Sequence, residues 1–402
     1  MKIVNINTRF KGGGGASAIA NLLHSFINNN TEHESVFLYA RGDKGDQKSI
    51  VINNQFDVYF SAAFARIFGV SKNLNFSSVI EEQIARADIV HIHNIHGYYI
   101  NYEKLIKIIK YYKKPVIWTL HDVWPITGRC AFTYDCGKWV TGCYNCSYKN
   151  TYPKTLLDRS SKEWNRKKEL FCSLDKDKVI FVSPSRWLEG FVKKSFLKEY
   201  FTEVIPNGIY SSSCVNVDKN DIREELNLPI NKKIVLFVAA DPNDKRKGIS
   251  YVLNLLDKLG EDVAFVSVGK KIKKIKKDNF IQLGYIKDKA CLNKIYRAAD
   301  IFLITSLDDN FPTTVLEAFS NALPVIGFKV GGIEEQLSNN CGILVEKENV
   351  YQLEREIRSL ILDEVKLSEL GKNGFNKFNQ EYTIDVFATR YLKLYEKLYR
   401  GE

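Results

Sequence analysis

The sequence predicts an α/β protein of two domains, each built around a parallel β-sheet. With 402 residues, the chain is longer than a typical single domain. Short apolar, β-branched runs recur along it without strict alternation of apolar and polar residues, and segments with helical spacing separate them. This pattern is typical of strands that are buried on both faces of a sheet and connected by helices.

The expected strands are short, and helices such as Ala16–Asn28 and Tyr102–Tyr112 connect them. In the first half the strands are expected at Lys2–Asn7, Ser35–Tyr39, Asp88–His93, Pro115–Leu120 and Val179–Val182. In the second half they are expected at Lys233–Ala239, Val263–Val268, Asp300–Ile304, Pro324–Phe328 and Gly342–Val345.

The break between the domains is expected within Ile205–Asn231, where a Pro-Asn-Gly turn is followed by the serine-rich stretch Ser211–Ser213. We therefore assign residues 1–205 to the first domain and 206–379 to the second. The amphipathic helix expected over Val386–Tyr399 returns to the first domain, so that residues 380–402 complete it. Ligands of such sheets bind beyond the carboxyl ends of the strands, which predicts a cleft between two facing sheets.

Composition narrows the class of protein. The chain is 45% hydrophobic and 26% charged, as in ordinary soluble proteins. It opens with a strand-like run rather than a signal peptide, and no apolar stretch approaches the roughly 20 residues of a membrane span. We therefore expect a cytoplasmic protein. The net charge of +11 calls for an anionic partner, and nucleic acid, anionic lipid and phosphorylated small molecules all qualify.

The most informative stretch is Ser306–Glu317 (SLDDNFPTTVLE), where a strand enters a polar loop and a helix begins near Pro312 or Thr313. Proline suits the first turn of a helix, and Thr313 or Thr314 can cap it. The free amides at such a helix start suit a diphosphate. Glu317, one turn further on, could accept hydrogen bonds from a pair of ribose hydroxyls.

This stretch, with Pro324 and Gly331-Gly332 after it, resembles the Glu-x7-Glu signature of the retaining glycosyltransferases of family 4 (group 1), which have the GT-B fold. The first acid is Asp309 here and the second is Glu317. The resemblance implies two Rossmann-like domains whose parallel sheets face a central cleft, with the first acid on the donor sugar and the second on the ribose. Aspartate is one methylene shorter than glutamate, which leaves the identity of the sugar open. The alternative is an acidic loop that caps a helix.

Two further segments of the second half resemble the family. Lys247, in Lys-Arg-Lys-Gly, matches a lysine whose charge neutralises the donor diphosphate. Ala239, Ala240 and Asp241 stand where the family has an arginine, and Arg246 is the expected substitute. The alternative is a solvated basic turn. Residues 282–286 (QLGYI) resemble the strand end whose backbone, near Ile286, pairs with the base, and an ordinary turn is the alternative. The donor-binding residues that the resemblance implies are Arg246, Lys247, Ile286, Asp309, Asn310, Phe311, Pro312, Thr313, Thr314 and Glu317.

In the first half, residues 12–17 (GGGGAS) follow the first strand and open a helix. They resemble the family's glycine loop, which places Gly14, Gly15 and Ala16 beneath the donor phosphate and the acceptor. His121, directly after a strand, matches a histidine near the transferring sugar. The alternative is a structural histidine held by Asp122. With Asp309 and Lys247, His121 completes the expected catalytic set.

The histidines and cysteines raise the question of metals. The resemblance implies no catalytic metal or other cofactor, so His91, His93 and His96 are not interpreted as ligands, and His93 is expected near the acceptor. Four cysteines with the spacing C-x5-C-x6-C-x2-C suit a structural zinc ion, or remain reduced thiols. These are Cys130, Cys136, Cys143 and Cys146. Together with HDVWPITG, they resemble a colanic-acid type subset of bacterial polysaccharide glycosyltransferases. Cys172, Cys214, Cys291 and Cys341 are expected to be packing residues.

Basic amphipathic segments at Tyr102–Lys114 and Trp187–Phe201 fit either a membrane surface or ordinary helices with solvated lysines. The interpretation that follows is retaining transfer of a hexose from a nucleoside diphosphate sugar. The acceptor is a glycan or lipid-linked oligosaccharide of bacterial surface polysaccharide synthesis, at the inner face of the membrane. A sugar-nucleotide epimerase or hydrolase is the alternative within enzymes. A zinc-containing nucleic-acid-binding protein is disfavoured, because acidic residues line the expected site, and no nucleic-acid partner is expected.

Overall fold

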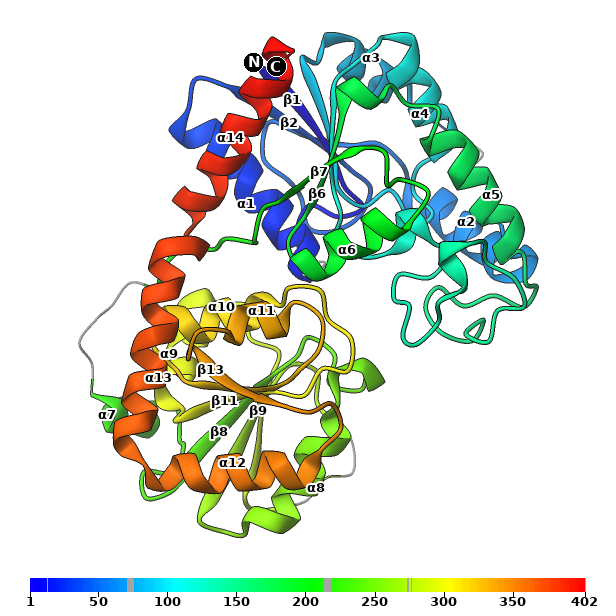
Figure 1. The fold of residues 1–402 in the computed structure, drawn as a ribbon. Helices are drawn as coiled ribbons and strands as arrows, with labels where there is room; N and C mark the ends of the chain where they lie inside the picture. Colours follow the sequence, from blue (N-terminus) through cyan, green and yellow to red (C-terminus); the bar gives the residue numbers. More distant parts are fainter. Residues whose placement is uncertain (13, 71–75, 213–217, 273–274, 276, 402) are drawn as a thin grey trace. The chain divides into compact units, whose positions relative to one another are not determined.

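The computed structural model describes the chain except for residues 13, 71–75, 213–217, 273–274, 276 and 402. Two compact units make up the chain (Figure 1). Unit 1 comprises Met1–Pro206 and residues 387–402, and unit 2 comprises Asn207–Val386. The expectations for Gly13, Ser213 and Cys214 lie outside the described residues.

Unit 1 is built on a seven-stranded sheet with the order β3-β2-β1-β4-β5-β6-β7, in which every paired strand is parallel. Its central strands are almost wholly buried and rich in Ile and Val, as parallel strands covered on both faces require. The strands are β1 (Lys2–Ile6), β2 (Glu34–Tyr39), β3 (Ser49–Val51), β4 (Ile89–Ile92), β5 (Val116–Thr119), β6 (Val179–Ser183) and β7 (Phe201–Val204).

Helices cover both faces of this sheet, and the last helix of the chain is one of them (Figure 1). On this helix, Tyr395 forms a 2.6 Å hydrogen bond between its hydroxyl and Nδ1 of His91, and Tyr391 bonds Thr119 at 2.8 Å. These buried bonds tie the C-terminus to β4 and β5. The helices are α1 (Gly15–Asn30), α2 (Gln55–Phe68), α3 (Ser78–Arg86), α4 (Tyr102–Tyr111), α5 (Ser160–Phe171), α6 (Arg186–Lys194) and α14 (Ile384–Arg400), with 3-10 turns η1 (Trp124–Ile126), η2 (Lys138–Val140) and η3 (Lys176–Lys178).

Unit 2 has a six-stranded parallel sheet with the order β10-β9-β8-β11-β12-β13. Its strands are β8 (Lys233–Val238), β9 (Val263–Val268), β10 (Phe280–Gly284), β11 (Ile301–Ile304), β12 (Val325–Phe328) and β13 (Gly342–Val345). The helices are α7 (Lys219–Glu225), α8 (Ile249–Leu259), α9 (Lys289–Ala298), α10 (Thr313–Ser320), α11 (Ile333–Leu337), α12 (Val350–Leu362) and α13 (Glu364–Lys377), with the 3-10 turn η4 (Lys245–Lys247) and the π-turn η5 (Phe378–Tyr382).

The strand orders of the two sheets agree except for the additional edge strand β7, and the first strand of each unit is the third in its order. In unit 1 the strands that follow β1 are added on one side of it, and from β4 onward they are added on the other side. In unit 2 the same change of direction occurs between β8 and β11. The loops after these paired strands diverge and leave a crevice in which doubly wound folds bind ligands. In unit 1 that point lies between β1 and β4, and in unit 2 it lies between β8 and β11.

The predicted strands all form, and their ends differ from the prediction by at most one residue. The edge strands β3 and β7 were not predicted, because they are short and mostly not buried. Strand β10 was recognised only at its end.

The two basic amphipathic segments prove to be ordinary packed helices. Leu105 and Ile109 of α4 are buried in the core of unit 1, as are Leu188 and Val192 of α6. Their apolar faces are therefore not available to a membrane. Among the described helices, none combines the length and the apolar character that crossing a bilayer requires.

Candidate active site

In unit 2, the loops after β8 and β11 bring together two of the predicted residues. Nζ of Lys247, in the turn η4, lies 2.5 Å from Oδ2 of Asp309, in the loop after β11. The same carboxylate oxygen accepts a hydrogen bond from the hydroxyl of Ser306 at 3.2 Å. Both side chains of the ion pair retain some exposure, 28% for the lysine and 16% for the aspartate. A cation and a carboxylate thus meet at the switch point of the sheet, and both remain open to a ligand.

Glycines allow the loops around this ion pair to pack closely. Gly248 has a left-handed φ of 69°, and a Cβ there would lie 2.0 Å from the carbonyl oxygen of Thr305. Gly331 has a φ of 55°, and a Cβ there would lie 1.9 Å from the carbonyl oxygen of Asp309. Only glycine tolerates both the conformation and the contact. The loops from β8 and β12 therefore hold the backbone of the Asp309 loop from two sides.

The helix α10 presents free backbone amides next to this loop. It begins at Thr313, Pro312 occupies the N-cap position, and no side chain caps it. The expectation that Thr313 or Thr314 caps the helix is therefore wrong, and their amides are left without a side-chain acceptor. The preceding backbone is fixed because Asn207 donates to the carbonyl of Phe311 at 3.1 Å. With no acidic residue in the first turn, this helix start suits an anion.

Glu317 lies on α10 in a contact that the sequence did not indicate. The hydroxyl of Tyr296, a buried residue of α9, donates to Oε2 of Glu317 at 2.7 Å. Burial raises the pKa of Glu317 to about 7, although the hydrogen bond from Tyr296 favours the ionised form. The carboxyl group therefore titrates near neutral pH. A ligand that donates further hydrogen bonds to it will favour its charged state.

Two other predicted donor residues lie in η4 and after β10. The guanidinium of Arg246 is bound by Asp244 at 2.5 Å, and the backbone carbonyl of Arg246 accepts a hydrogen bond from Leu307, in the loop that carries Asp309. Ile286 follows β10, which is separated from β8 by β9, and its side chain is partly buried against the core of unit 2.

In unit 1, the strand ends of β4 and β5 bring His93 and His121 together. Nδ1 of His93 lies 3.0 Å from Nε2 of His121, and Nε2 of His93 lies 3.3 Å from Oδ1 of Asn5. The amide of Asn5 donates to Ser35, so its oxygen faces His93 as an acceptor. His93 must then donate from Nε2 and accept at Nδ1, and His121 donates from its Nε2.

This chain of bonds determines the state of His121. Its Nδ1 is left as the nitrogen with a lone pair. Burial lowers the pKa of His121 to about 4, and it lowers the pKa of His93 well below its usual range. At neutral pH His121 is therefore an uncharged ring. Asn5 was not predicted, because only the parallel pairing of β1 with β4 brings it beside His93.

Asp122 has bonded partners on both carboxylate oxygens, and its negative charge also acts on the neighbouring His121. Its Oδ2 lies 2.8 Å from Nε2 of His96, and its Oδ1 accepts a hydrogen bond from the backbone of Trp124 at 2.9 Å. Asp122 therefore orients His96 and the turn η1.

The glycine loop leads into α1 as the sequence suggested. Gly14 occupies the N-cap position with a φ of 82°, and α1 begins at Gly15 followed by Ala16. No side chain caps the helix, and its first turn has no acidic residue. The start of α1 therefore presents a second set of free backbone amides. It follows β1, one of the two strands at the switch point of unit 1.

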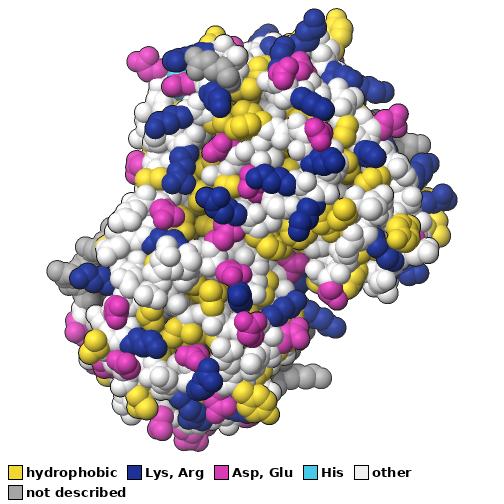
Figure 2. Space-filling view, viewed as in Figure 1, with side chains coloured by type: hydrophobic (Ala, Val, Ile, Leu, Met, Phe, Trp, Pro, Cys, Tyr) yellow, Lys and Arg dark blue, Asp and Glu magenta, His cyan; other side chains and the backbone are white. Residues whose placement is uncertain are grey.

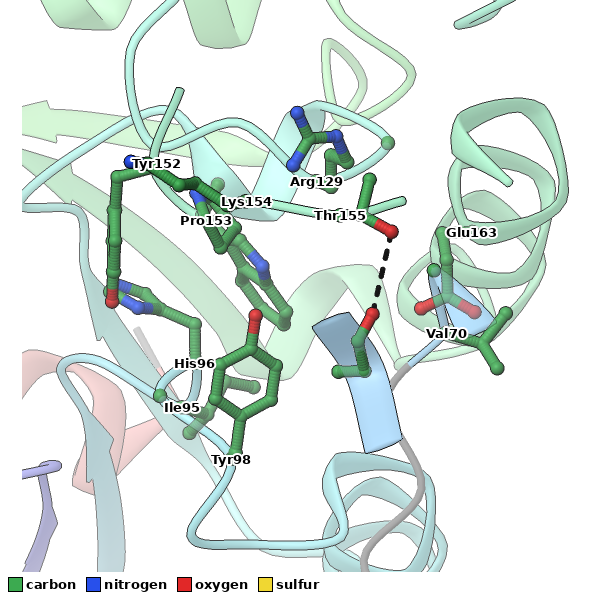
Figure 3. Close-up of a pocket in the computed structure, with 15 residues that line it drawn as sticks. Val70, Ile95, His96, Tyr98, Arg129, Tyr152, Pro153, Lys154, Thr155 and Glu163 are labelled. Atoms are coloured by element: carbon green, nitrogen blue, oxygen red, sulfur yellow. Dashed lines mark hydrogen bonds between the residues drawn. The ribbon is translucent and has the colours of Figure 1, made fainter. Parts of the chain in front are cut away.

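A pocket opens next to His96 (Figure 3). The side chains of Tyr98, Arg129 and Tyr152 surround it, and a hydrogen bond from Thr155 to the carbonyl of Ala65 closes one side. Tyr98 has a φ of 65°, a conformation that non-glycine residues rarely adopt and that is common at functional sites.

All four clustered cysteines line one pocket of unit 1. They are free thiols, and Cys143 accepts a hydrogen bond from the backbone of Gly128. Two buried cations lie nearby. Lys167 donates to the carbonyls of Trp124 and Thr127, whereas Nε and Nη1 of Arg129 are buried without a hydrogen-bond partner in the described residues. In the part of the chain that the structure describes, no three His, Cys, Asp or Glu side chains are arranged to hold a metal ion as they stand.

The other cysteines differ among themselves. Cys341 is buried and Cys291 is partly buried, as expected of packing residues, whereas Cys172 is exposed, and the expectation for it was wrong.

Comparison with known proteins decides the family. A family model described as Glycosyltransferase Family 4 matches residues 12–212, half of the chain, and one described as Glycosyl transferases group 1 matches residues 218–377. The chain is a glycosyltransferase of family 4. It is 28% identical over 98% of its length to the whole of an Escherichia coli K12 protein named as a colanic acid biosynthesis glycosyl transferase, WcaC.

Other relatives match part of the chain. The N,N'-diacetylbacillosaminyl-diphospho-undecaprenol alpha-1,3-N-acetylgalactosaminyltransferase of Campylobacter jejuni is 29% identical over 55% of this glycosyltransferase and 61% of its own length. The alpha-galactosylglucosyldiacylglycerol synthase of Streptococcus pneumoniae is 25% identical over 54% of this chain and 60% of its own.

Solved structures identify the fold as GT-B. A sucrose-phosphate synthase from Thermosynechococcus elongatus superposes with a TM-score of 0.70 at 16% identity, over the full length of both chains. The Anabaena protein HepE, solved in complex with UDP-glucose, superposes with a TM-score of 0.68 at 15% identity, over 99% of this chain and all of its own.

Proposed function

We propose that this glycosyltransferase transfers a hexose from a nucleoside diphosphate sugar, with retention of anomeric configuration, to a glycan or lipid-linked acceptor in bacterial surface polysaccharide synthesis. The observation that carries the proposal is the ion pair of Lys247 with Asp309 at the switch point of unit 2, next to the uncapped start of α10. A cation and free amides suit a diphosphate, and a carboxylate suits sugar hydroxyls.

Each of these groups has a part in the proposed reaction. As the bond between sugar and phosphate lengthens, negative charge grows on the departing diphosphate, and Lys247 and the amides of Thr313 and Thr314 stabilise it. Asp309 accepts hydrogen bonds from the sugar, and Glu317 accepts them from the ribose. In unit 1, His121 is a neutral ring at the end of β5 and is assigned to a hydroxyl of the transferring sugar.

The acceptor class is proposed from the relatives. The full-length relative is named for colanic acid biosynthesis, and the names of two partial relatives include undecaprenol and diacylglycerol. These names support a glycan or lipid-linked acceptor at the inner face of the membrane. A nucleic-acid partner has less support, because Lys and Arg on the face shown in Figure 2 are interspersed with Asp, Glu and apolar side chains rather than gathered in one stripe.

We also propose a structural zinc ion bound by Cys130, Cys136, Cys143 and Cys146. Four thiolates around one zinc ion carry a net charge of about −2, which would compensate Arg129 and Lys167. Two nitrogens of the buried Arg129 guanidinium have no hydrogen-bond partner among the described residues, and negatively charged thiolates beside them would lower this cost, which supports the proposal. Binding requires the thiols to move together from their described positions.

The proposed function is tested by a thermal-shift panel of UDP-, GDP- and ADP-sugars, followed by incubation with the stabilising donor and analysis of products. We expect one donor to raise Tm above the others, and no change of that donor without an acceptor beyond slow hydrolysis. Conversion of the donor to an epimer in the absence of an acceptor would instead support the epimerase alternative. No stabilisation by any nucleotide sugar would refute the donor class.

A further inference from the structure

The helix α2 exposes the face that a helix of a soluble protein usually buries. Phe56, Tyr59, Phe60 and Ile67 are 77%, 66%, 48% and 48% exposed, and their spacing places them along one face. The opposite, buried face carries the small residues Val58, Ser61 and Ala65. Large apolar side chains gathered in this way on a surface mark a binding site for another molecule.

A second segment extends this apolar surface. Leu156 and Leu157 are 66% and 45% exposed. The backbone of Leu156 donates to the carbonyl of Arg66 on α2 at 2.8 Å, and a Cβ at Gly69 would lie 2.3 Å from the carbonyl of Leu157. Residues 152–157 therefore lie directly against the C-terminal end of α2. We call the exposed apolar residues of α2 and of this segment the α2 patch.

Basic residues surround the α2 patch. The guanidinium of Arg41 lies 5.6 Å from the centre of the Tyr59 ring. Exposed basic side chains at Arg66, Lys149, Lys154 and Arg159 belong to α2 and to the segment around residues 152–157, where Asp57 and Asp158 are the acidic residues. An apolar surface with aromatic side chains and a rim that is mainly positive matches the boundary between the acyl chains and headgroups of an anionic bilayer.

The patch adjoins the candidate active site of unit 1. Tyr152, Lys154 and Thr155 line the pocket of Figure 3, and His96 lies beside Tyr152 in its wall. The rings of Tyr152 and His96 are in edge contact at 6.5 Å, and His96 pairs with Asp122 next to His121. The acidic residue of the pocket, Glu163, is bound by Arg166 and Tyr102.

We propose that the α2 patch docks this glycosyltransferase onto the anionic surface of a lipid bilayer, with the adjoining pocket receiving the head group of a lipid-linked acceptor. The inference rests on the proposed function for its acceptor, while the docking itself depends only on the patch. Phe56, Tyr59 and Phe60 enter the interface, and the basic rim meets the lipid phosphates.

Vesicle co-sedimentation of the full chain tests the proposal, with vesicles of phosphatidylethanolamine and phosphatidylglycerol and with vesicles of phosphatidylcholine. We expect binding to the anionic vesicles and weaker binding to the neutral ones. The triple variant Phe56→Ser, Tyr59→Ser, Phe60→Ser should lose roughly 100-fold in partition coefficient, because each side chain that leaves the interface contributes about ten-fold or less. A second variant, Leu156→Ser with Leu157→Ser, should weaken binding by a smaller factor.

Matched controls are apolar residues that are as exposed elsewhere. Leu362→Ser with Val365→Ser changes two side chains of unit 2 that are 86% and 79% exposed, and Tyr111→Ser changes α4, where a membrane surface was first considered. Both should bind vesicles as the unchanged protein does. Absence of vesicle binding, or equal binding by the triple variant, would overturn the proposal. So would a dimer that the triple variant converts to a monomer, because the occupant would then be a second copy.

The donor thermal shift separates this inference from the proposed function. If the triple variant loses vesicle binding but keeps the donor shift, the α2 patch is a docking surface and the donor site is intact. If the protein binds vesicles but no nucleotide sugar, the docking inference holds and the proposed transfer fails.

Discussion

Glu317 makes the stability of unit 2 depend on pH in a way that a single substitution removes. Its pKa is raised to about 7 in the fold from an ordinary value of 4.5, because burial disfavours the charged form. Between these two values the folded protein holds a proton that the unfolded chain has released. The contribution of Glu317 to the free energy of unfolding is therefore fully present below about pH 4.5, falls as pH rises, and is lost above about pH 7. At 1.36 kcal/mol per pH unit, the free energy of unfolding should fall by about 3 kcal/mol across this window.

Glu317→Gln keeps the shape and removes the titration. The assay is urea unfolding of both proteins from pH 4.5 to 8, and the quantity of interest is the difference between them. This subtraction is needed because the histidines with lowered pKa, such as His93 and His121, act in the opposite direction over part of the window. We expect the free energy of unfolding of the variant, relative to that of the unchanged protein, to increase as pH rises. This difference should become constant above pH 7. A difference that stays constant with pH would show that Glu317 is ionised as in water, and would refute the reasoning.

Further predictions concern binding, turnover and metal. Lys247→Met should weaken binding of the preferred donor by about 10- to 100-fold, because a charge-assisted hydrogen bond is lost. The control Lys245→Met, on the same turn, should change the donor Kd little, and calorimetry measures both values. His121→Ala should lower turnover at least 100-fold while the donor Kd stays unchanged, and an unaltered rate would remove His121 from the mechanism. The purified protein should contain about one zinc per chain by mass spectrometry of metals, and Cys143→Ser should lower both the zinc content and Tm, whereas Cys172→Ser should alter neither.

The sequence predicted the sheets well, because buried parallel strands have a local signature. Runs such as residues 301–304 are apolar throughout, and nothing but a covered strand fits them. The edge strands β3 and β7 have no such signature, since one or both faces meet solvent and only pairing with β2 or β6 defines them. The same reasoning explains the donor loop, where proline, glycine and acid spacing are local features.

Contacts between distant residues could not be predicted in this way. The bond between His93 and His121 depends on the register of β4 and β5, and that between Tyr296 and Glu317 depends on how α9 packs against α10. The α2 patch is the clearest case. No prediction was made for α2 from the sequence, because Phe and Tyr at helical spacing do not by themselves show whether they face the core or the solvent, and the structure shows that they are exposed.

The central claim is that unit 2 holds the diphosphate of a sugar nucleotide at the start of α10. A crystal structure of the full chain with the donor selected by thermal shift tests it most directly. The account predicts phosphate oxygens within hydrogen-bond distance of Nζ of Lys247 and of the amides of Thr313 and Thr314, with the ribose on Glu317. A donor that binds with its diphosphate away from Lys247 and from the amides of Thr313 and Thr314 would contradict it.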